Sequence, residues 1–503
     1  MQRKAAIQTK TTPPILICGG LILACFIALS ASSAKTKEPW EDESWFGAVT
    51  YNLASKGSLS TDILEGQGTF REGMAHHFYW EPPLSFVTNA AAVELFGFSL
   101  FTIRSVSTAF GMAAVLCAFL LARKLTGSEG TGLLAMALVA SDYFFVIGSS
   151  DGRMDAMCMA LGFAGVTTYF LLREKHLLAA IVLSQIFIAA SGLTHPNGMI
   201  WFLGLWLLIL RFDRGRLRLG MLAAAALPYL VAAAGWGAFI ARDPHDFLVQ
   251  FLGNIRESGS SNGSLQHPLM HPLQAIVSEL TERYIYPFGL GTGIPPMNRT
   301  KAVILLIYTG SLIAAGLSRQ IRRSLAGQAV LCLIAVSFLM LTYMDGNKMS
   351  YYLIHITPLL AILTAMVLWS ALSRGGRMRW PAVFIAGALI VVQAAGILYR
   401  VRQATYAHQY LPAVAAIRSN SNPGDLVIGS AAFFWTLRGE RHLKDDFRLG
   451  YYTHAHPQLI VIGPFYRTLD RHAGVDLQTY LRNTLASYHT VPFRGEYEIL
   501  APN

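Results

Sequence analysis

The sequence alternates between long apolar stretches and short polar turns, a pattern typical of a chain that crosses a membrane many times. A helix needs about 20 mainly apolar residues to cross the hydrocarbon core of a bilayer. Eleven apolar stretches are therefore predicted as membrane spans: 14–33, 101–122, 130–149, 155–172, 177–193, 197–210, 219–240, 302–318, 326–343, 351–372 and 381–399.

The composition agrees with this interpretation. Of the 503 residues, 53% are hydrophobic and only 14% are charged, whereas soluble domains average about 25% charged residues. These values exclude a disordered chain and a nucleic-acid-binding module, although the net charge is +11. The five cysteines lie in or beside apolar stretches, so no disulfide framework or zinc-binding spacing is indicated.

The basic residues of the short turns predict the orientation of the chain. Turns after the even-numbered spans hold 14 Lys and Arg residues, whereas the short turns after spans three, five and nine hold only Arg153 and Lys348. Because cytoplasmic loops are the basic ones, we expect the N-terminus inside and the long segments 34–100, 241–301 and 400–503 outside. Any chemistry is therefore expected on the extracytoplasmic face, out of direct reach of cytoplasmic nucleotides.

The pattern also predicts two domains. Residues 1–399 are expected to form an all-α membrane domain of about eleven transmembrane helices. Residues 400–503 are expected to form a small extracytoplasmic α/β domain, because Leu426–Ile428 and Leu459–Ile462 are β-type runs bounded by Gly and Pro. Amphipathic helices are predicted in this segment over 411–420 and 476–487.

The first outer segment opens with three acids, Glu41-Asp42-Glu43, directly after the first span. Apolar residues at helical spacing predict an amphipathic helix over 43–57 that lies on the membrane surface, with Asp42 as its N-cap. Asp42 is therefore either a plain helix cap or a reactive carboxylate. A second interfacial helix is predicted over 84–97, too short to span the bilayer.

The same segment ends in His76-His77-Phe78-Tyr79-Trp80-Glu81-Pro82-Pro83. The diproline forces an extended turn, and Glu81 before it would be held at membrane depth. The alternative is a simple interfacial anchor. His76 and His77 together with a carboxylate are a candidate metal-ligand set, although the spacing is not diagnostic of one, and His77 and Glu81 are also candidate substrate contacts.

Four further outer residues are candidates for substrate contacts. Asp155 begins a span, where an ionisable group usually faces a cavity or a partner, and Arg153 is its nearest partner in sequence. The two form either an ion pair that fixes the turn or part of a site. His195 and Lys348 lie in the other short outer turns, and a cation there suits a phosphate head group.

In order along the chain, these features resemble a known family. The acids after span one, the acid/aromatic-Pro-Pro-Leu turn, the stretch Phe96-Gly97-Phe98-Ser99 to Arg104-Ser105, Arg153-Met154-Asp155 and the Tyr351-Tyr352-Leu-x5-Pro358 pattern carry the likeness. It is a resemblance to the GT-C class of integral-membrane glycosyltransferases, in the branch of the protein O-mannosyltransferases and the bacterial aminoarabinose transferase of lipid A.

The resemblance implies an inverting transfer of a sugar from a polyprenyl-monophosphate donor. It implies Asp42 as general base with Glu43 beside it, and Asp155 as the second acidic position. Many bacterial relatives have Glu-Lys-Pro-Pro at the diproline turn, whereas this chain has Trp80-Glu81. The phosphate-binding cation is therefore expected elsewhere, at Lys348, at Arg153 or in the 241–301 loop, with Tyr351 among the donor contacts.

Several alternatives stay open at this point. A transporter or flippase of a lipid-linked saccharide is one alternative function, and a membrane-anchored assembly or sensor protein is another. No cofactor is certain, and a divalent cation is an open option. The expected partners are the lipid donor, the membrane and a lipid, glycan or protein acceptor, without nucleic acid. The extracytoplasmic α/β domain favours a bacterial inner membrane.

Overall fold

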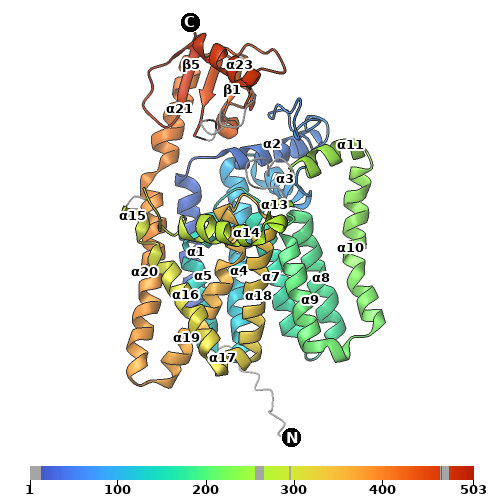
Figure 1. Ribbon diagram of the computed structural model, residues 1–503, viewed down its shortest axis with the longest axis vertical. Coiled ribbons are helices and arrows are strands. Elements are labelled where there is room, and N and C mark those ends of the chain that lie inside the picture. The colour runs from blue at the N-terminus through green and yellow to red at the C-terminus, as the bar shows by residue number, and fades with distance from the viewer. Residues whose placement is uncertain (1–12, 255–265, 294–295, 465, 467–474) are drawn as a thin grey trace.

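The computed structural model describes residues 13–254, 266–293, 296–464, 466 and 475–503. It consists of a membrane domain of upright helices with a small sheet domain above it (Figure 1). Among these described residues, eight helical segments are long and apolar enough to cross a membrane. They are α1 (Pro13–Thr36), α4 (Leu100–Thr126), α7 (Asp155–Leu172), α8 (Leu177–Thr194), α10 (Leu219–Ile240), α18 (Leu325–Met344), α19 (Thr357–Arg374) and Gly376–Ser419, which contains η5 (Gly376–Met378) and α20 (Arg379–Gln403).

The remaining three predicted spans are also helical. Two of them are helices of 16 residues, α9 (Gly198–Asp213) and α16 (Ala302–Leu317). The third is a pair, α5 (Glu129–Ser141) and α6 (Tyr143–Ser149), bent by 64° at Asp142. The Asp142 carboxylate caps α6 by accepting the Phe145 N–H at 2.9 Å, so the side chain competes with the regular helix at this point. The predicted all-α polytopic fold is confirmed.

One predicted span begins later than expected. Residues 351–355 belong to a short 3₁₀ helix, η4 (Ser350–His355), and α19 starts only at Thr357. Pro358 lies in the first turn of α19, where its missing N–H costs nothing. Tyr351 and Tyr352 therefore lie above the span instead of inside it.

The first outer segment contains α2 (Glu41–Lys56) and α3 (Leu84–Phe96). The helix α2 does not lie on a membrane surface, because residues from Glu43 to Thr50 are all buried. It packs against α3 on one side and against the C-terminal domain on the other. Nor is Asp42 its N-cap: Trp40 is, and the Glu43 carboxylate accepts the Trp40 N–H at 3.4 Å. A glutamate three residues after the cap is well placed for this bond.

The second outer segment holds short helices. They are α11 (Pro244–Phe247), η2 (Leu248–Leu252), α13 (Gln266–Met270), α14 (Pro272–Ser278), η3 (Glu279–Ile285) and α15 (Pro296–Arg299). Of these, α13 and α14 cross the front of the molecule in Figure 1, while α11 lies higher, near α2. Two short helices, η1 (Arg214–Arg216) and α17 (Arg319–Arg323), lie at the opposite ends of the spans.

The C-terminal domain is a mixed five-stranded sheet with helices, as the α/β prediction required. Its strands have the order β2-β1-β3-β5-β4. The three central strands, β1, β3 and β5, have the most buried side chains. Strand β1 is parallel to both of its neighbours, β2 and β3. The elements are η6 (Tyr406–Tyr410), α21 (Leu411–Ser419), β1 (Leu426–Gly429), η7 (Ala431–Phe433), α22 (Phe434–Leu437), β2 (His442–Lys444), β3 (Leu459–Ile462), α23 (Val475–Ala486), β4 (Tyr488–Thr490) and β5 (Glu498–Pro502).

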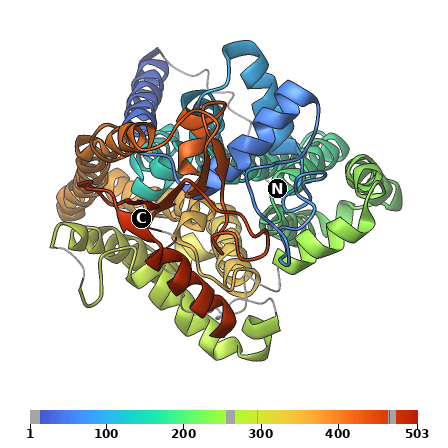
Figure 2. The same ribbon diagram turned by 90° about the horizontal axis from the view of Figure 1, so that it is seen from above.

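This domain is docked directly on α2, and the view from above shows it over the centre of the membrane domain (Figure 2). The Trp45 indole N–H donates to Asp445 at 2.7 Å, and the Trp435 indole N–H donates to Ser44 at 2.9 Å. Close approach requires glycine at position 47, since a Cβ there would lie 2.4 Å from the Trp435 ring. The sheet domain thus fixes the helix that carries Asp42 and Glu43.

Candidate active site at the outer ends of the spans

Asp42, Arg153 and Asp155 form one linked group. The Arg153 Nε donates to the Asp155 carboxylate at 2.7 Å, and its Nη1 donates to the Asp42 carboxylate. The Arg153 side chain is only 5% exposed, whereas that of Asp42 is 18% exposed. Arginine can hold two carboxylates because its planar guanidinium presents several donors. The residues brought together here are 111 positions apart.

Local structure explains why these carboxylates meet. Asp42 lies in the first turn of α2, and Asp155 is the first residue of α7. The N-terminus of a helix carries partial positive charge and unpaired N–H groups, which favour a carboxylate. The short turn between α6 and α7 places Arg153 between the two helix ends. Aromatic rings cover the guanidinium, with the Tyr351 centroid at 4.0 Å and the Trp40 centroid at 5.4 Å.

Glu43, although adjacent to Asp42, lies in a different environment. It is fully buried, and Arg104 binds it with two bonds of 2.8 and 2.6 Å. The Gly152 N–H donates to the same carboxylate at 2.6 Å. Burial favours the neutral acid, but the Arg104 and Lys37 charges and these bonds outweigh it and lower the pKa of Glu43.

Arg104 also ties the end of α1 to α4. It donates to the backbone carbonyls of Ala34, Lys37 and Glu38 at 2.7, 2.7 and 3.0 Å. Its role could have been inferred from the sequence, because an arginine near the start of an apolar span requires a partner.

Glu81 and His195 lie near Asp155, as a second pair. The His195 Nε2 is 3.7 Å from a Glu81 oxygen. The Asn197 N–H donates to His195 Nδ1 at 3.1 Å, so the neutral imidazole carries its proton on Nε2. Burial lowers the pKa of His195 to about 4 against the opposing charge of Asp155. Burial and the Asp155 charge raise the pKa of Glu81 well above 4.5, which favours the neutral acid in the folded protein.

Two carboxyl oxygens in this region have no hydrogen-bond partner among the described residues. They are Oδ1 of Asp155 and Oε2 of Glu81, and both atoms are buried. Buried polar atoms are normally paired, because each unpaired atom costs roughly 1–3 kcal/mol. The unpaired oxygens therefore mark a place where a polar ligand would complete the hydrogen bonding. His355, which sequence reasoning missed, also has an unpaired buried Nδ1 and lies close to Asp155.

Two other predicted site residues, Lys348 and His77, lie apart from the group of Asp42, Arg153 and Asp155. Lys348 is buried, donates to the Thr342 carbonyl and has its Nζ 3.6 Å from Glu279. Arg283 forms ion pairs with both Glu279 and Asp345. The two cations, Lys348 and Arg283, are thus matched by two carboxylates of the protein itself. Burial lowers the pKa of Lys348, against the attraction of Glu279.

His77 belongs to a separate candidate metal-ligand group. Ligand atoms of His77, Asp243 and Asp246 lie within 4.8 Å of one another. Histidine and carboxylate ligands suit Zn²⁺ and related cations. This group joins the end of the first outer segment to the start of the second, and it does not include Asp42 or Asp155.

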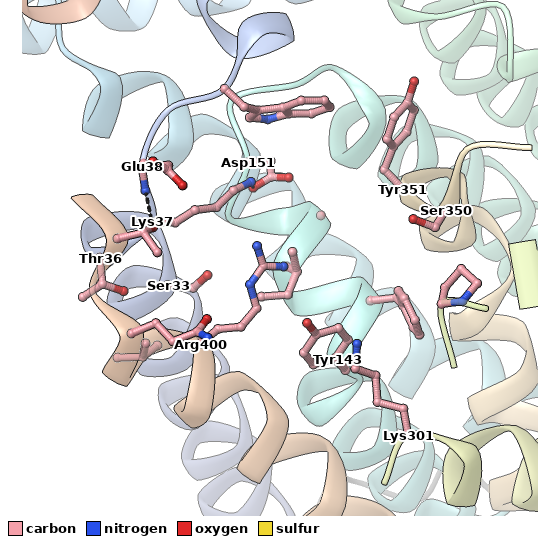
Figure 3. Close-up of a pocket in the computed structure, with 18 of the residues that line it drawn as sticks. Ser33, Thr36, Lys37, Glu38, Tyr143, Asp151, Lys301, Ser350, Tyr351 and Arg400 are labelled. Carbon is pink, nitrogen blue, oxygen red and sulfur yellow. Dashed lines mark hydrogen bonds and ion pairs between the residues drawn. The ribbon is translucent and has the colours of Figure 1, made fainter. Parts of the chain in front are cut away.

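A cavity of about 560 Å³ adjoins the carboxylate group on the other side of Trp40 and Tyr351, which line it. Figure 3 shows Lys37, Lys301 and Arg400 at this cavity, together with Asp151 and Tyr143. Sequence reasoning did not single out these cations, because they come from three distant parts of the chain.

Comparison with known proteins supports the resemblance. Residues 80–239 match the family model "Dolichyl-phosphate-mannose-protein mannosyltransferase". That range includes Glu81, Arg153, Asp155 and His195 but not Asp42. By sequence, no curated protein matches the chain significantly.

Solved structures match the chain over nearly all its length. ArnT from Cupriavidus metallidurans bound to undecaprenyl phosphate has a TM-score of 0.59 at 14% identity, with 98% of each chain covered. The archaeal oligosaccharyltransferase AglB from Archaeoglobus fulgidus, in complex with an inhibitory peptide and a dolichol-phosphate, has a TM-score of 0.58 at 15% identity, covering 98% of this chain and 74% of that chain. These likenesses confirm the predicted fold, and the chain is thereby identified as a membrane protein with the GT-C glycosyltransferase fold.

Proposed function

We propose that this protein is an inverting glycosyltransferase that moves a sugar from a polyprenyl-monophosphate donor to an acceptor on the extracytoplasmic face. The observation that carries the proposal is the linked group Asp42–Arg153–Asp155, with a buried unpaired carboxylate oxygen, inside a GT-C fold. ArnT, of the same fold, was solved with undecaprenyl phosphate bound. The acceptor is a lipid, a glycan or a protein.

In the proposed reaction, Asp42 is the general base. It takes the proton of the acceptor hydroxyl while that oxygen forms a bond to the anomeric carbon. The bond from this carbon to the phosphate oxygen breaks, and polyprenyl phosphate leaves. Attack opposite the leaving group inverts the anomeric configuration. A positioned base of this type contributes about 10²–10⁴ in rate. Asp42 is suited to this role because it is the partly exposed carboxylate of the group.

The neighbouring residues have distinct proposed roles. Arg153 holds Asp42 and Asp155 in place, and Asp155 offers its unpaired oxygen to a substrate hydroxyl. Glu43 is a positioning residue, because Arg104 and Gly152 occupy its oxygens. Glu81 and His195 are proposed hydrogen-bonding groups for sugar or acceptor hydroxyls.

The leaving phosphate requires compensation of its charge, and two predicted cations are already engaged. Lys348 faces Glu279, and Arg153 faces two aspartates. A divalent cation is one remaining source of positive charge. The cavity beyond Trp40 and Tyr351 is another, considered below.

We also propose a bacterial inner-membrane location with the site outside. The basic helix α17 lies at the bottom of Figure 1, whereas the sheet domain and α2 lie at the top. Since basic turns stay cytoplasmic, the site faces the extracytoplasmic side. In this proposal residues 1–399 are the catalytic membrane domain, and residues 400–503 cover its outer face.

Identification of co-purified lipid tests the function. The protein is purified in mild detergent as wild type, as Asp42→Asn and as the control Asp62→Asn, whose side chain is 68% exposed in the same outer segment. Mass spectrometry of extracted lipid is expected to show polyprenyl phosphate with the wild type and control. With Asp42→Asn it should show the glycosylated donor, whose sugar mass identifies the substrate.

Two results would contradict the proposal. An oligosaccharide on a lipid diphosphate would favour a flippase instead. Phospholipid alone, with no polyprenyl phosphate in any sample and no transfer from synthetic polyprenyl-phosphate sugars, would remove the proposed donor.

A further inference from the structure

The cavity beside the carboxylate group is lined by more cationic side chains than the acidic side chains around it neutralise. It lies between the ends of α1, α6, α16 and α20 and has a volume of about 560 Å³. Lys37 is paired with Asp151 across its wall. Lys301 and Arg400 also line it, and neither forms an ion pair with any residue that the structure describes. Figure 3 shows the two cations entering from opposite sides, with Tyr143 between them.

The depth of these cations in the membrane is defined by the helices that carry them. Lys37 directly follows α1, Lys301 directly precedes α16, and Arg400 lies one turn from the end of α20. All three positions are at the same ends of their spans, the ends proposed to face outward. Lipid phosphates lie at this level of a bilayer. Arg and Lys together suit phosphate, because one gives paired donors and the other a compact charge.

The remaining lining groups favour a bound anion. The acids there are Asp151, which Lys37 neutralises, and Glu38. Burial raises the pKa of Glu38 to about 7, although a bond from Tyr497 and the Lys37 charge oppose this and Glu496 and Glu41 reinforce it. About half of the Glu38 side chains are therefore neutral at pH 7. Lys301 and Arg400 leave the cavity with net positive charge.

The rings of Trp40 and Tyr351 separate the cavity from Arg153, which binds the carboxylates. Trp40 and Tyr351 line it, with ring centroids 5.8 Å apart, and the same two rings cover Arg153. The indole N–H of Trp40 is buried and has no acceptor among the described residues. A phosphate in the cavity would thus be separated from Arg153, which binds Asp42, by the rings of Trp40 and Tyr351, and these rings could contact a sugar attached to that phosphate.

We propose that this cavity binds the phosphomonoester head group of a membrane lipid through Arg400 and Lys301. Lipid binding at this place stands on the cavity alone. Only the statement that this phosphate is the leaving group of the donor rests on the proposed function.

Binding measurements on the full-length protein test the proposal. Undecaprenyl phosphate is titrated into detergent-solubilised protein, and binding is followed by native mass spectrometry. Arg400→Gln and Lys301→Gln are each expected to weaken binding at least tenfold, and the double variant further. The matched controls Arg402→Gln and Arg299→Gln, exposed residues close by on the same helices or helix ends, should stay within about twofold.

The lipid probes identify the recognised chemistry. Undecaprenol, which lacks the phosphate, should bind at least tenfold more weakly to wild type and should not distinguish the variants. Phosphatidylglycerol, a phosphodiester, should compete poorly. Equal competition by phosphatidylglycerol would overturn the phosphomonoester assignment. Unchanged undecaprenyl phosphate binding in a double variant with wild-type thermal stability would overturn the site itself.

Failure of the site and failure of the function give different results. Asp42→Asn keeps the cavity intact, so it should bind undecaprenyl phosphate normally while losing transfer. If the cavity variants lose binding but the wild type transfers no sugar, the lipid site stands and the transferase proposal fails. If transfer occurs and the double variant supports it at the wild-type rate and donor concentration, the site is wrong and the function stands.

Discussion

Asp42 and Glu43 are neighbours on α2, yet their surroundings differ. Glu43 has no exposed surface and receives two bonds from Arg104 and two from the backbone N–H groups of Gly152 and Trp40. Asp42 keeps part of its surface exposed and shares Arg153 with Asp155, which has an oxygen left over. Both sites pair a carboxylate with a buried arginine. They differ in whether the protein alone completes the hydrogen bonding.

This difference separates a structural ion pair from a candidate reactive one. A buried carboxylate whose oxygens are all occupied holds segments together, and a substrate would have to displace a partner to reach it. A carboxylate near unpaired atoms can accept a ligand without that loss. We therefore propose that Glu43 anchors the fold and that Asp42 takes part in the chemistry, and four substitutions test this proposal.

The largest effect is expected for Asp42→Asn. The amide cannot accept the proton of the acceptor, so sugar transfer should fall by about 10²–10⁴. Thermal stability should stay close to that of the wild type, because Asn keeps the size and one oxygen for Arg153. Transfer is measured with a polyprenyl-phosphate sugar identified by co-purification. An active Asn variant would remove Asp42 from the role of base.

Glu43→Gln is expected to act on the fold. Removal of one partner from a buried ion pair typically costs about 3–5 kcal/mol, because the other charge stays buried. Arg104 would lose its counter-charge at the junction of α1, α2 and α4. The melting temperature and the amount of folded protein should fall together, with activity per folded molecule retained. Glu94→Gln, on the exposed side of α3, is the matched control. Full stability with lost activity would instead indicate a catalytic Glu43.

Asp155→Asn should show an intermediate and mixed result. Its bond to Arg153 is charge-assisted, and loss of such a bond costs about 1.5–3 kcal/mol. Because Arg153 also holds Asp42, both stability and transfer should decrease. Chemical denaturation and initial transfer rates on the same preparation separate the two effects. Lost transfer at unchanged stability would mean that Asp155, like Asp42, is needed for the reaction and not for folding.

The smallest effect is expected for Glu81→Gln. Burial and the Asp155 charge raise the pKa of Glu81 well above 4.5, so the folded protein favours the neutral acid, which Gln resembles in size and charge. The amide should therefore change stability by less than about 1 kcal/mol. The folded state holds this proton more tightly than the unfolded state, so wild-type stability falls relative to Glu81→Gln as pH rises above about 4.5. Parallel unfolding curves from pH 5 to 9 would disprove the raised pKa, and unchanged transfer would make the diproline turn purely structural.

The sequence predicts the helices better than it predicts their surroundings. Span positions follow from local hydropathy, so all eleven apolar stretches are helical. The surroundings of α2 could not be predicted from hydropathy. Its apolar face was expected to lie against lipid. In fact both of its sides are covered by protein, by α3 and by a domain whose contacts come from residues near 435 and 445.

The candidate site shows the same limit. The Arg153–Asp155 pair is two residues apart and was visible in the sequence, and Asp42 was marked by its place after span one. The buried pairing of Lys348 and Glu279 could not be predicted, because it joins residues across a long outer loop. Nor could the cavity cations, since Lys301 and Arg400 meet only when α16 and α20 pack together.

The docking of the sheet domain on α2 has a consequence for biogenesis. Trp45 and its acceptor Asp445 are 400 residues apart. At synthesis rates of about 5–20 residues per second, the ribosome needs roughly 20–80 s to travel between them. For about three quarters of that interval the growing chain already contains both Asp42 and Arg153, but the side of α2 that the sheet domain will cover is still bare. Under the proposed function, the nascent protein is thus expected to stay inactive until the sheet domain has docked on α2.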